Sequence, residues 1–176
     1  MQLALFTVAQ VVGGVVGSAF LRAAIDERQN YRDDGRLGAL YVRKNANDGQ
    51  AFLWEFMATF IVLLVFVETS YNKRVRTGNV AALAQGIAYF VGAAITEQWT
   101  GGGMNPARAF GPALVADRWD EHWVWWVAPY IAALIVIPLA AFVFNVAELA
   151  FVSSGSSRPV AADEEDGHPM RVVDQK

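Results

Sequence analysis

The sequence contains no cysteine, and only two of its 176 residues are histidine. No disulfide framework and no cysteine-based zinc site can form from such a composition. His122 and His168 have no cluster of partners in the sequence, so neither a metal nor another cofactor is expected. The net charge of −3 is small, and the densest run of acids, 163–166, lies near the C-terminus. This balance argues against binding to nucleic acid.

Charge is also scarce: 18% of the residues are charged and 55% are hydrophobic, against about 25% and about 45–50% in soluble domains. The charges separate four apolar runs, at residues 3–21, 51–67, 80–96 and 123–146. A bilayer core needs about 20 apolar residues in a helix, so the runs predict four transmembrane helices. After residue 152 the composition changes to Ser, Gly, Pro and acids, which predicts a disordered acidic tail over residues 151–176.

The first run is not expected to be a secretory signal. No Lys or Arg precedes Arg22, and the run is longer than the usual apolar region of about 7–15 residues.

Small residues repeat at four-residue spacing in two of the runs, as Gly13 and Gly17, Gly14 and Ser18, and Ala82 and Gly86. Such spacing lets two helix backbones approach closely in lipid, although small residues are also simply common in membrane helices. The tryptophans Trp123, Trp125 and Trp126 open the last run and predict a position at the membrane interface.

Residues 97–116 follow an apolar run yet contain four glycines, two prolines and one arginine. Three consecutive glycines, Gly101 to Gly103, do not form a stable helix, and irregular backbone at membrane depth is tolerated only inside protein or beside a watery cavity. Asn105 and Pro106 suit the cap and first position of a helix. The sequence therefore predicts a re-entrant half-helix over 107–116, whose positive dipole end lies at Asn105. Such ends recur in pores that exclude cations and protons.

Taken whole, Gly-Gly-Gly-Met-Asn-Pro-Ala-Arg-Ala-Phe-Gly-Pro-Ala at 101–113 closely resembles the second signature of aquaporins and glycerol facilitators, the major intrinsic protein family. Residues 9–14, 55–60 and 122–130 resemble the third, fourth and sixth spans of that family. The resemblance implies an all-α membrane protein with an incomplete aquaporin-like helical bundle: four transmembrane helices plus one re-entrant half-helix. The bundle would occupy residues 1–150 and lack the first two spans and the first Asn-Pro-Ala half-helix.

The resemblance also implies roles for individual residues. Asn105, followed by Pro106 and Ala107, would orient water by donating a hydrogen bond from its amide. The carbonyls of Gly101, Gly102 and Gly103 would line the path as acceptors. Arg108 matches the constriction arginine, and Ala93 and Gly102 match two further constriction positions. Glu55, an acid inside a span, would accept N–H groups of the loop before Asn105 rather than carry protons.

These matches imply a passive water channel, integral to a membrane and multi-pass. The small side chains at the constriction leave passage of small neutral solutes as an open alternative. Water is favoured by Ala109 and Ala113, which are small where glycerol facilitators carry an acid and a base. The family resemblance suggests a homotetramer. An alternative is a truncated, non-conducting relative that associates with full-length subunits; another is an unrelated polytopic membrane protein. No pairing of a nucleophile with a base is recognisable, so an enzyme is not expected.

Overall fold

A computed structural model describes residues 2–25, 36–72 and 80–143 of the chain. The described residues form five helices and no strand: α1 (Gln2–Ala24), α3 (Asp48–Tyr71), α4 (Val80–Thr100), α5 (Pro106–Ala116) and α6 (Val124–Val143). All except α5 are long and apolar enough to cross a membrane. The predicted all-α class and the four spans are therefore confirmed, while the tail predicted at 151–176 lies outside the described residues.

Three spans, α1, α3 and α4, are longer than their apolar runs. α3 begins three residues earlier than expected because Asn47 forms a reciprocal capping box with Gln50, which satisfies backbone N–H groups that a helix start otherwise leaves unpaired. α4 continues to Thr100, directly before the glycines. The hydroxyl of Thr100 bonds back to the carbonyl of Thr96 inside the helix.

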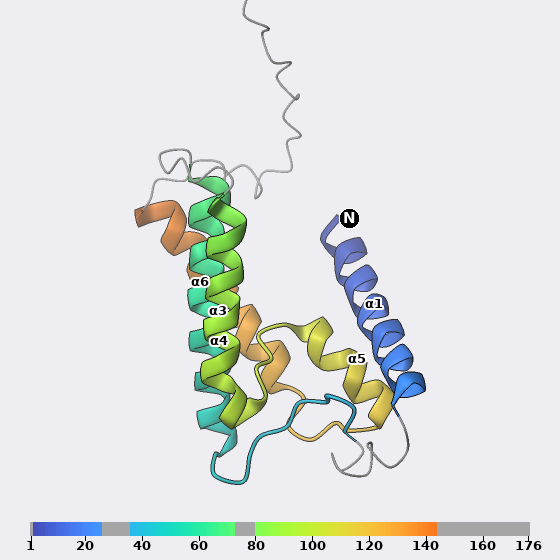
Figure 1. Cartoon of the computed structure of the whole chain (residues 1–176). Helices are drawn as coiled ribbons and strands as arrows, with labels where there is room; N and C mark the ends of the chain where they lie inside the picture. The colour runs from blue at the N-terminus through green and yellow to red at the C-terminus, as the bar shows by residue number, and fades with distance from the viewer. Residues whose placement is uncertain (1, 26–35, 73–79, 144–176) are drawn as a thin grey trace, which may run out of the picture.

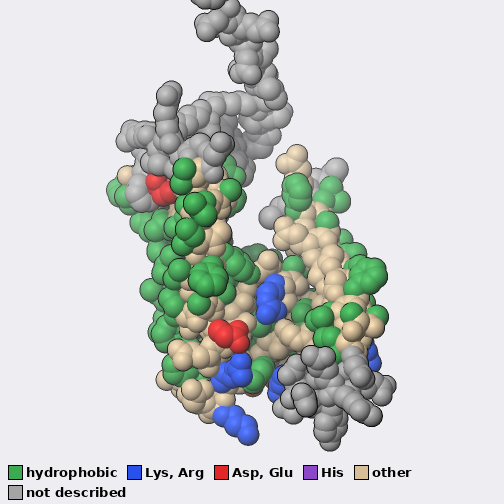
Figure 2. Space-filling view, in the orientation of Figure 1, with side chains coloured by type: hydrophobic (Ala, Val, Ile, Leu, Met, Phe, Trp, Pro, Cys, Tyr) green, Lys and Arg blue, Asp and Glu red, His purple; other side chains and the backbone are tan. Residues whose placement is uncertain are grey.

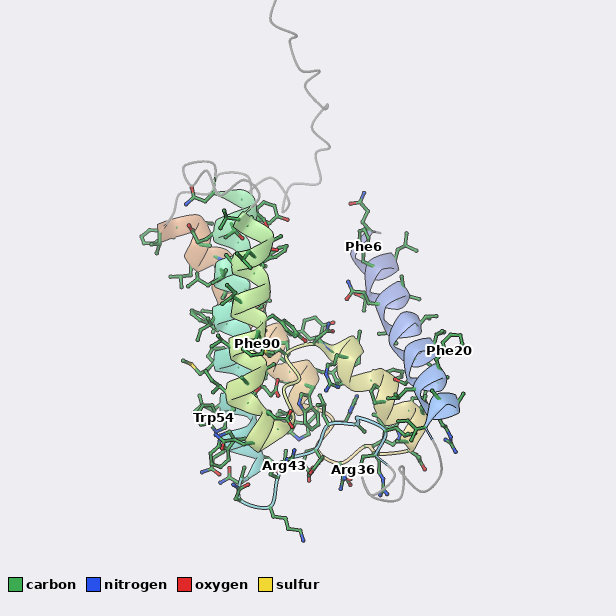
Figure 3. The ribbon with its side chains drawn as sticks, in the orientation of Figure 1. Phe6, Phe20, Arg36, Arg43, Trp54 and Phe90 are labelled. Carbon is green, nitrogen blue, oxygen red and sulfur yellow. The ribbon has the colours of Figure 1, made fainter. Side chains whose placement is uncertain are left out.

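The helices fall into two groups (Figure 1). α3 packs against both α4 and α6, whereas α1 packs on α5, and α5 makes a smaller contact with α6. Only 6% of the apolar window of α1 is buried within the protein, compared with 28% for α3 and for α6. Exposed hydrophobic side chains such as Phe6, Phe20 and Phe90 project from the helices (Figure 3). A surface of this kind suits contact with lipid or with further membrane helices.

α1 and α5 meet through glycines. A Cβ atom on Gly111 would collide with the backbone carbonyl of Gly14, and one on Gly14 would lie 2.7 Å from the carbonyl oxygen of Ala107. At the ends of the two helices, Arg22 Nη1 donates to Val115 O at 2.7 Å. The contact thus depends on backbone surfaces that have no side chain between them.

Among the residues that the structure describes, the other predicted small-residue contacts are not formed. Gly13, Gly17 and Gly86 have open space where a Cβ would lie, because they face away from the α1–α5 and α3–α4 contacts. Trp125 is fully buried within the protein, whereas Trp123 is 45% exposed, and the interfacial position of both stays a prediction. Two residues along a helix correspond to a turn of about 200°, so Trp123 and Trp125 point to opposite sides of α6.

Trp125 belongs to a buried cluster that joins several elements: Leu40, Ala51, Ala109, Val124 and Trp125, with Val42 packed against them. The cluster connects the 36–47 loop with α3, α5 and α6. It lies on the same side of the molecule as the loop before α5, and so fixes the surroundings of the predicted site.

Candidate pore-lining site

The start of α5 has the geometry of a capped half-helix. Asn105 Oδ1 accepts hydrogen bonds from Ala107 N at 2.9 Å and from Arg108 N at 3.4 Å. Pro106 occupies the first helical position, where its missing N–H removes no bond. The helix ends after 11 residues at Asp117, whose φ of 52° closes it in the left-handed conformation. The positive end of the α5 dipole therefore lies at Asn105.

The segment before Asn105 is irregular, and we call residues 101–104 the glycine loop. Gly101 and Gly102 have φ values of 83° and 71°, in the left-handed region that glycine adopts freely. Gly103 is required for space, since a Cβ there would overlap the Trp125 indole ring. A Cβ on Gly102 would lie 3.2 Å from the carbonyl oxygen of Ala93, so the two small residues of the predicted constriction are neighbours.

Glu55 of α3 holds the glycine loop. Its Oε2 accepts from Met104 N at 2.6 Å, and its Oε1 accepts from Gly103 N at 3.0 Å. Oε1 also accepts from the hydroxyl of Thr100 at 2.5 Å and from the indole nitrogen of Trp125 at 3.1 Å. The side chain is fully buried, and these four donors come from α4, the loop and α6. A buried carboxyl group is tolerated when donors surround it in this way.

Asn105 opens onto a cavity of about 280 Å³. Its walls come from α1, α3, α4, the start of α5 and α6, through Thr7, Gln10, Val11, Thr59, Leu63, Tyr89, Met104, Asn105, Pro106, Ala107, Pro129, Tyr130 and Ala133. Because Asn105 Oδ1 is turned to the α5 backbone, its amide nitrogen is available on the cavity side. Of the predicted site residues, only Asn105, Pro106 and Ala107 lie on this wall.

The remaining predicted residues lie beside the cavity. Arg108 is half-buried, and its Nη1 donates to Gly38 O in the 36–47 loop at 3.2 Å. Ala93 contacts the backbone of Gly102, as described above. Gly103 O is 3.4 Å from the hydroxyl of Tyr89, its donor. The structure therefore divides the predicted set into the cavity residues and a second group around Arg108, Ala93 and the glycine loop.

Basic side chains gather around the 36–47 loop (Figure 2). Two of them, Arg36 and Arg43, lie on this loop (Figure 3), with their guanidinium carbons 3.9 Å and 4.6 Å from the centre of the Tyr41 ring. Arg43 also pairs with Glu97 at the end of α4 at 3.3 Å and donates to the Tyr41 hydroxyl. These contacts attach the loop to the bundle on the side of Arg108.

His122 lies in the turn before α6, within an aromatic cluster. Its ring is 4.9 Å from that of Trp119 and 6.2 Å from that of Phe110, and its Nε2 accepts from Trp126 Nε1 at 3.0 Å. Burial lowers the pKa of His122 below its usual value of 6.5. The fold therefore favours the neutral ring, whose stabilising contribution is present above pH 6.5 and is lost as the pH falls through the lowered pKa.

The neighbouring Glu121 has the opposite dependence. Burial, followed by the charges of Asp120 and Asp48, raises its pKa, and Arg36 opposes the rise. The fold favours the protonated form of this carboxyl, so its contribution improves as the pH falls. The two adjacent groups thus respond to acid with opposite signs.

A family model described as major intrinsic protein matches residues 1–144. The chain belongs to this family. Aquaporin A of Dictyostelium discoideum is 37% identical to it over 142 residues, which cover 80% of this chain and 48% of the relative. Aquaporin-4 of Bos taurus is 32% identical over 139 residues (79% and 42%), and aquaporin-1 of Rattus norvegicus is 30% identical over 139 residues (79% and 50%).

Membership of the major intrinsic protein family confirms the resemblance carried by residues 101–113. Together with four apolar helices, it identifies the chain as an integral, multi-pass membrane protein. The chain spans about half the length, or less, of the curated relatives it matches.

Some residues of this site were not predicted from the sequence. Thr59 and Tyr89 line the cavity beside Asn105, and Thr100 and Trp125 donate to Glu55. A signal existed for Thr100, a hydroxyl directly before the glycines, whereas nothing in the sequence distinguished Trp125 from Trp123 and Trp126. Thr59 lies one helical turn from Glu55, so it shares the inward face of α3. Tyr89 had no signal beyond its spacing of four from Ala93.

Proposed function

We propose that this protein is a passive water channel and that its described residues supply the part of the pore that contains Asn105. The observation that carries the proposal is the position of Asn105: a capped half-helix begins at a cavity that α1, α3, α4 and α6 line. Its relatives named aquaporins support the same assignment.

Asn105 would act through its amide group. Since Oδ1 is engaged by Ala107 N and Arg108 N, the NH₂ group donates to the oxygen of a water molecule in the cavity. The α5 dipole adds a positive potential at the same point. A water molecule held by its oxygen turns both hydrogens away from Asn105. The chain of hydrogen bonds along which protons would pass is thereby interrupted.

The glycine loop would supply acceptors, the carbonyls of Gly101, Gly102 and Gly103. Glu55 keeps the peptide planes of the Gly102 and Gly103 carbonyls oriented because it accepts the N–H groups of Gly103 and Met104. Its four donors leave this carboxyl no role in carrying protons. It is a positioning residue.

Arg108 would repel cations and donate to water near Ala93 and Gly102. Because the side chains at those two positions are small, small neutral solutes are a second class of permeant. The same proposal includes assembly: the protein would form a homotetramer in a lipid bilayer, or would assemble with full-length relatives.

Osmotic shrinkage of proteoliposomes that contain the full chain tests the proposal. Water efflux well above that of empty vesicles is expected, and a rate equal to that of empty vesicles contradicts water conduction.

Asn105→Asp tests the role of the amide. The substitution keeps the capping oxygen but replaces the NH₂ donor by charge, and we expect it to reduce water flux about tenfold or more, equivalent to ~1.4 kcal/mol. Asn47→Asp is the matched control, because Asn47 caps α3 in the same manner through Gln50 N and does not line the cavity. Equal fluxes for the two variants would refute the role of Asn105.

Arg108→Val tests the charge. Cation leakage should rise while water flux is retained, measured as dissipation of a sodium gradient. Lys44→Val, on the 36–47 loop, is the control, and no difference between the two variants contradicts a barrier at Arg108.

A further inference from the structure

Tyr89 of α4 lies where a permeating solute would pass. It lines the same cavity as Asn105, and its hydroxyl donates to Gly103 O at 3.4 Å. The N–H of the same peptide group, that of Met104, donates to Glu55 Oε2. The ring is thus attached to the glycine loop at one end and to α4 at the other.

Tyr89 and Ala93 share one face of α4, because residues four apart lie above one another on a helix. Ala93 touches the backbone of Gly102, on the side of Arg108. Tyr89 lies one turn nearer the start of α4, about 6 Å along the helix axis. The face of α4 that carries Ala93 therefore also carries the large ring of Tyr89, one helical turn away, where it lines the cavity.

We infer that Tyr89 is the residue that limits solute size in this pore. The inference rests on the proposed channel function and deepens it. Ala93 and Gly102 are too small to restrict a solute, so the narrowest point of the path lies at Tyr89, one helical turn along α4 from Ala93. Water passes the ring, whereas a three-carbon polyol such as glycerol is retarded. The ring supplies the restriction, and the bond from its hydroxyl to Gly103 O fixes the orientation of the ring.

The experiment compares glycerol and water permeability in proteoliposomes that contain the full chain, by osmotic shrinkage with sorbitol and with glycerol. Tyr89→Ala should raise the ratio of glycerol to water permeability about tenfold or more, which corresponds to a barrier lower by ~1.4 kcal/mol. Tyr89→Leu should give an intermediate ratio. Tyr89→Phe keeps the ring and should leave the ratio close to that of the unmodified protein.

Phe90→Ala is the matched control. Phe90 is the next residue of α4, is 71% exposed and does not line the cavity, so the loss of its ring should leave the ratio unchanged. The permeability ratio is the deciding measurement. A loss of packing alone would lower the yield of folded protein, but it would not make the ratio rise in step with the decreasing size of the side chain at position 89.

The outcomes separate the inference from the function it rests on. If the unmodified protein conducts water and Tyr89→Ala and Phe90→Ala have equal ratios, the inference is wrong and the channel proposal stands. If the unmodified protein conducts no water, both are wrong. An increase in the ratio for Tyr89→Phe as large as that for Tyr89→Ala also overturns it, because the hydroxyl and not the ring would then set the restriction.

Discussion

Glu55→Gln should loosen the glycine loop with little change in side-chain volume. A glutamine offers one acceptor oxygen in place of two. If its amide nitrogen occupies the place of Oε2, it faces the Met104 N–H; if it occupies the place of Oε1, it faces the donors from Thr100, Gly103 and Trp125. The first arrangement costs less, because only one donor is affected. It still places the new NH₂ group against the Met104 N–H, and neither group then has an acceptor.

The magnitude follows from the two groups left without partners. A buried donor that loses its acceptor costs ~1–3 kcal/mol. The Met104 N–H and the new NH₂ group together therefore lower the free energy of unfolding by about 4 kcal/mol. That value is within the usual range for breaking a buried charged interaction, ~3–5 kcal/mol.

Unfolding in mixed micelles of increasing SDS content, followed by tryptophan fluorescence, measures this loss. Glu97→Gln is the matched control: Glu97 is a carboxyl at the end of α4, is 63% exposed and makes one ion pair with Arg43. Exposed ion pairs contribute ~0–1 kcal/mol, so this variant should be nearly as stable as the unmodified protein. A Glu55→Gln variant as stable as Glu97→Gln would refute the assignment of Glu55 as the group that holds the loop.

Two further perturbations have signs that the structure fixes. Gly111→Ala should lower the midpoint of thermal unfolding and expose α1 to protease, because the added methyl meets the Gly14 carbonyl. Gly17→Ala, whose methyl meets open space, should change neither. Equal midpoints for the two variants would contradict a tight α1–α5 contact. Acidification from about pH 7.5 to about pH 5 should lower the thermal midpoint less in His122→Gln than in the unmodified protein, because only the histidine gains a disfavoured charge in this range. An unchanged pH dependence in that variant would show that burial of His122 does not matter for stability.

The sequence predicted the spans and the half-helix because both depend on local chemistry. Asn105 and Pro106 define the start of α5 through capping and a missing N–H, and apolar runs define α1, α3, α4 and α6 through length. The contacts that hold the site are different in kind. Thr100 and Trp125 reach the same carboxyl from residues 45 and 70 positions away from Glu55, and no local pattern specifies that meeting. Likewise, glycine spacing in α1 did not distinguish Gly14, which packs against α5, from Gly13, where an added Cβ would meet none of the described residues within 4 Å.

The position of Asn105 depends unequally on the two groups of helices. The loop before it is fixed to α3 by Glu55 and packed on Trp125 of α6, so the α3, α4 and α6 group determines where the half-helix begins. α1 packs on α5 from its first turn, through Gly14 at Ala107 and Gly111, and closes one side of the cavity through Thr7 and Gln10. Disruption of α1 packing should therefore alter the cavity wall and the first turn of α5 while the glycine loop stays in place, whereas disruption of Glu55 should displace the loop and Asn105 with it. In the proposed channel, the three-helix group would therefore orient the permeant, and α1 would close one side of its path.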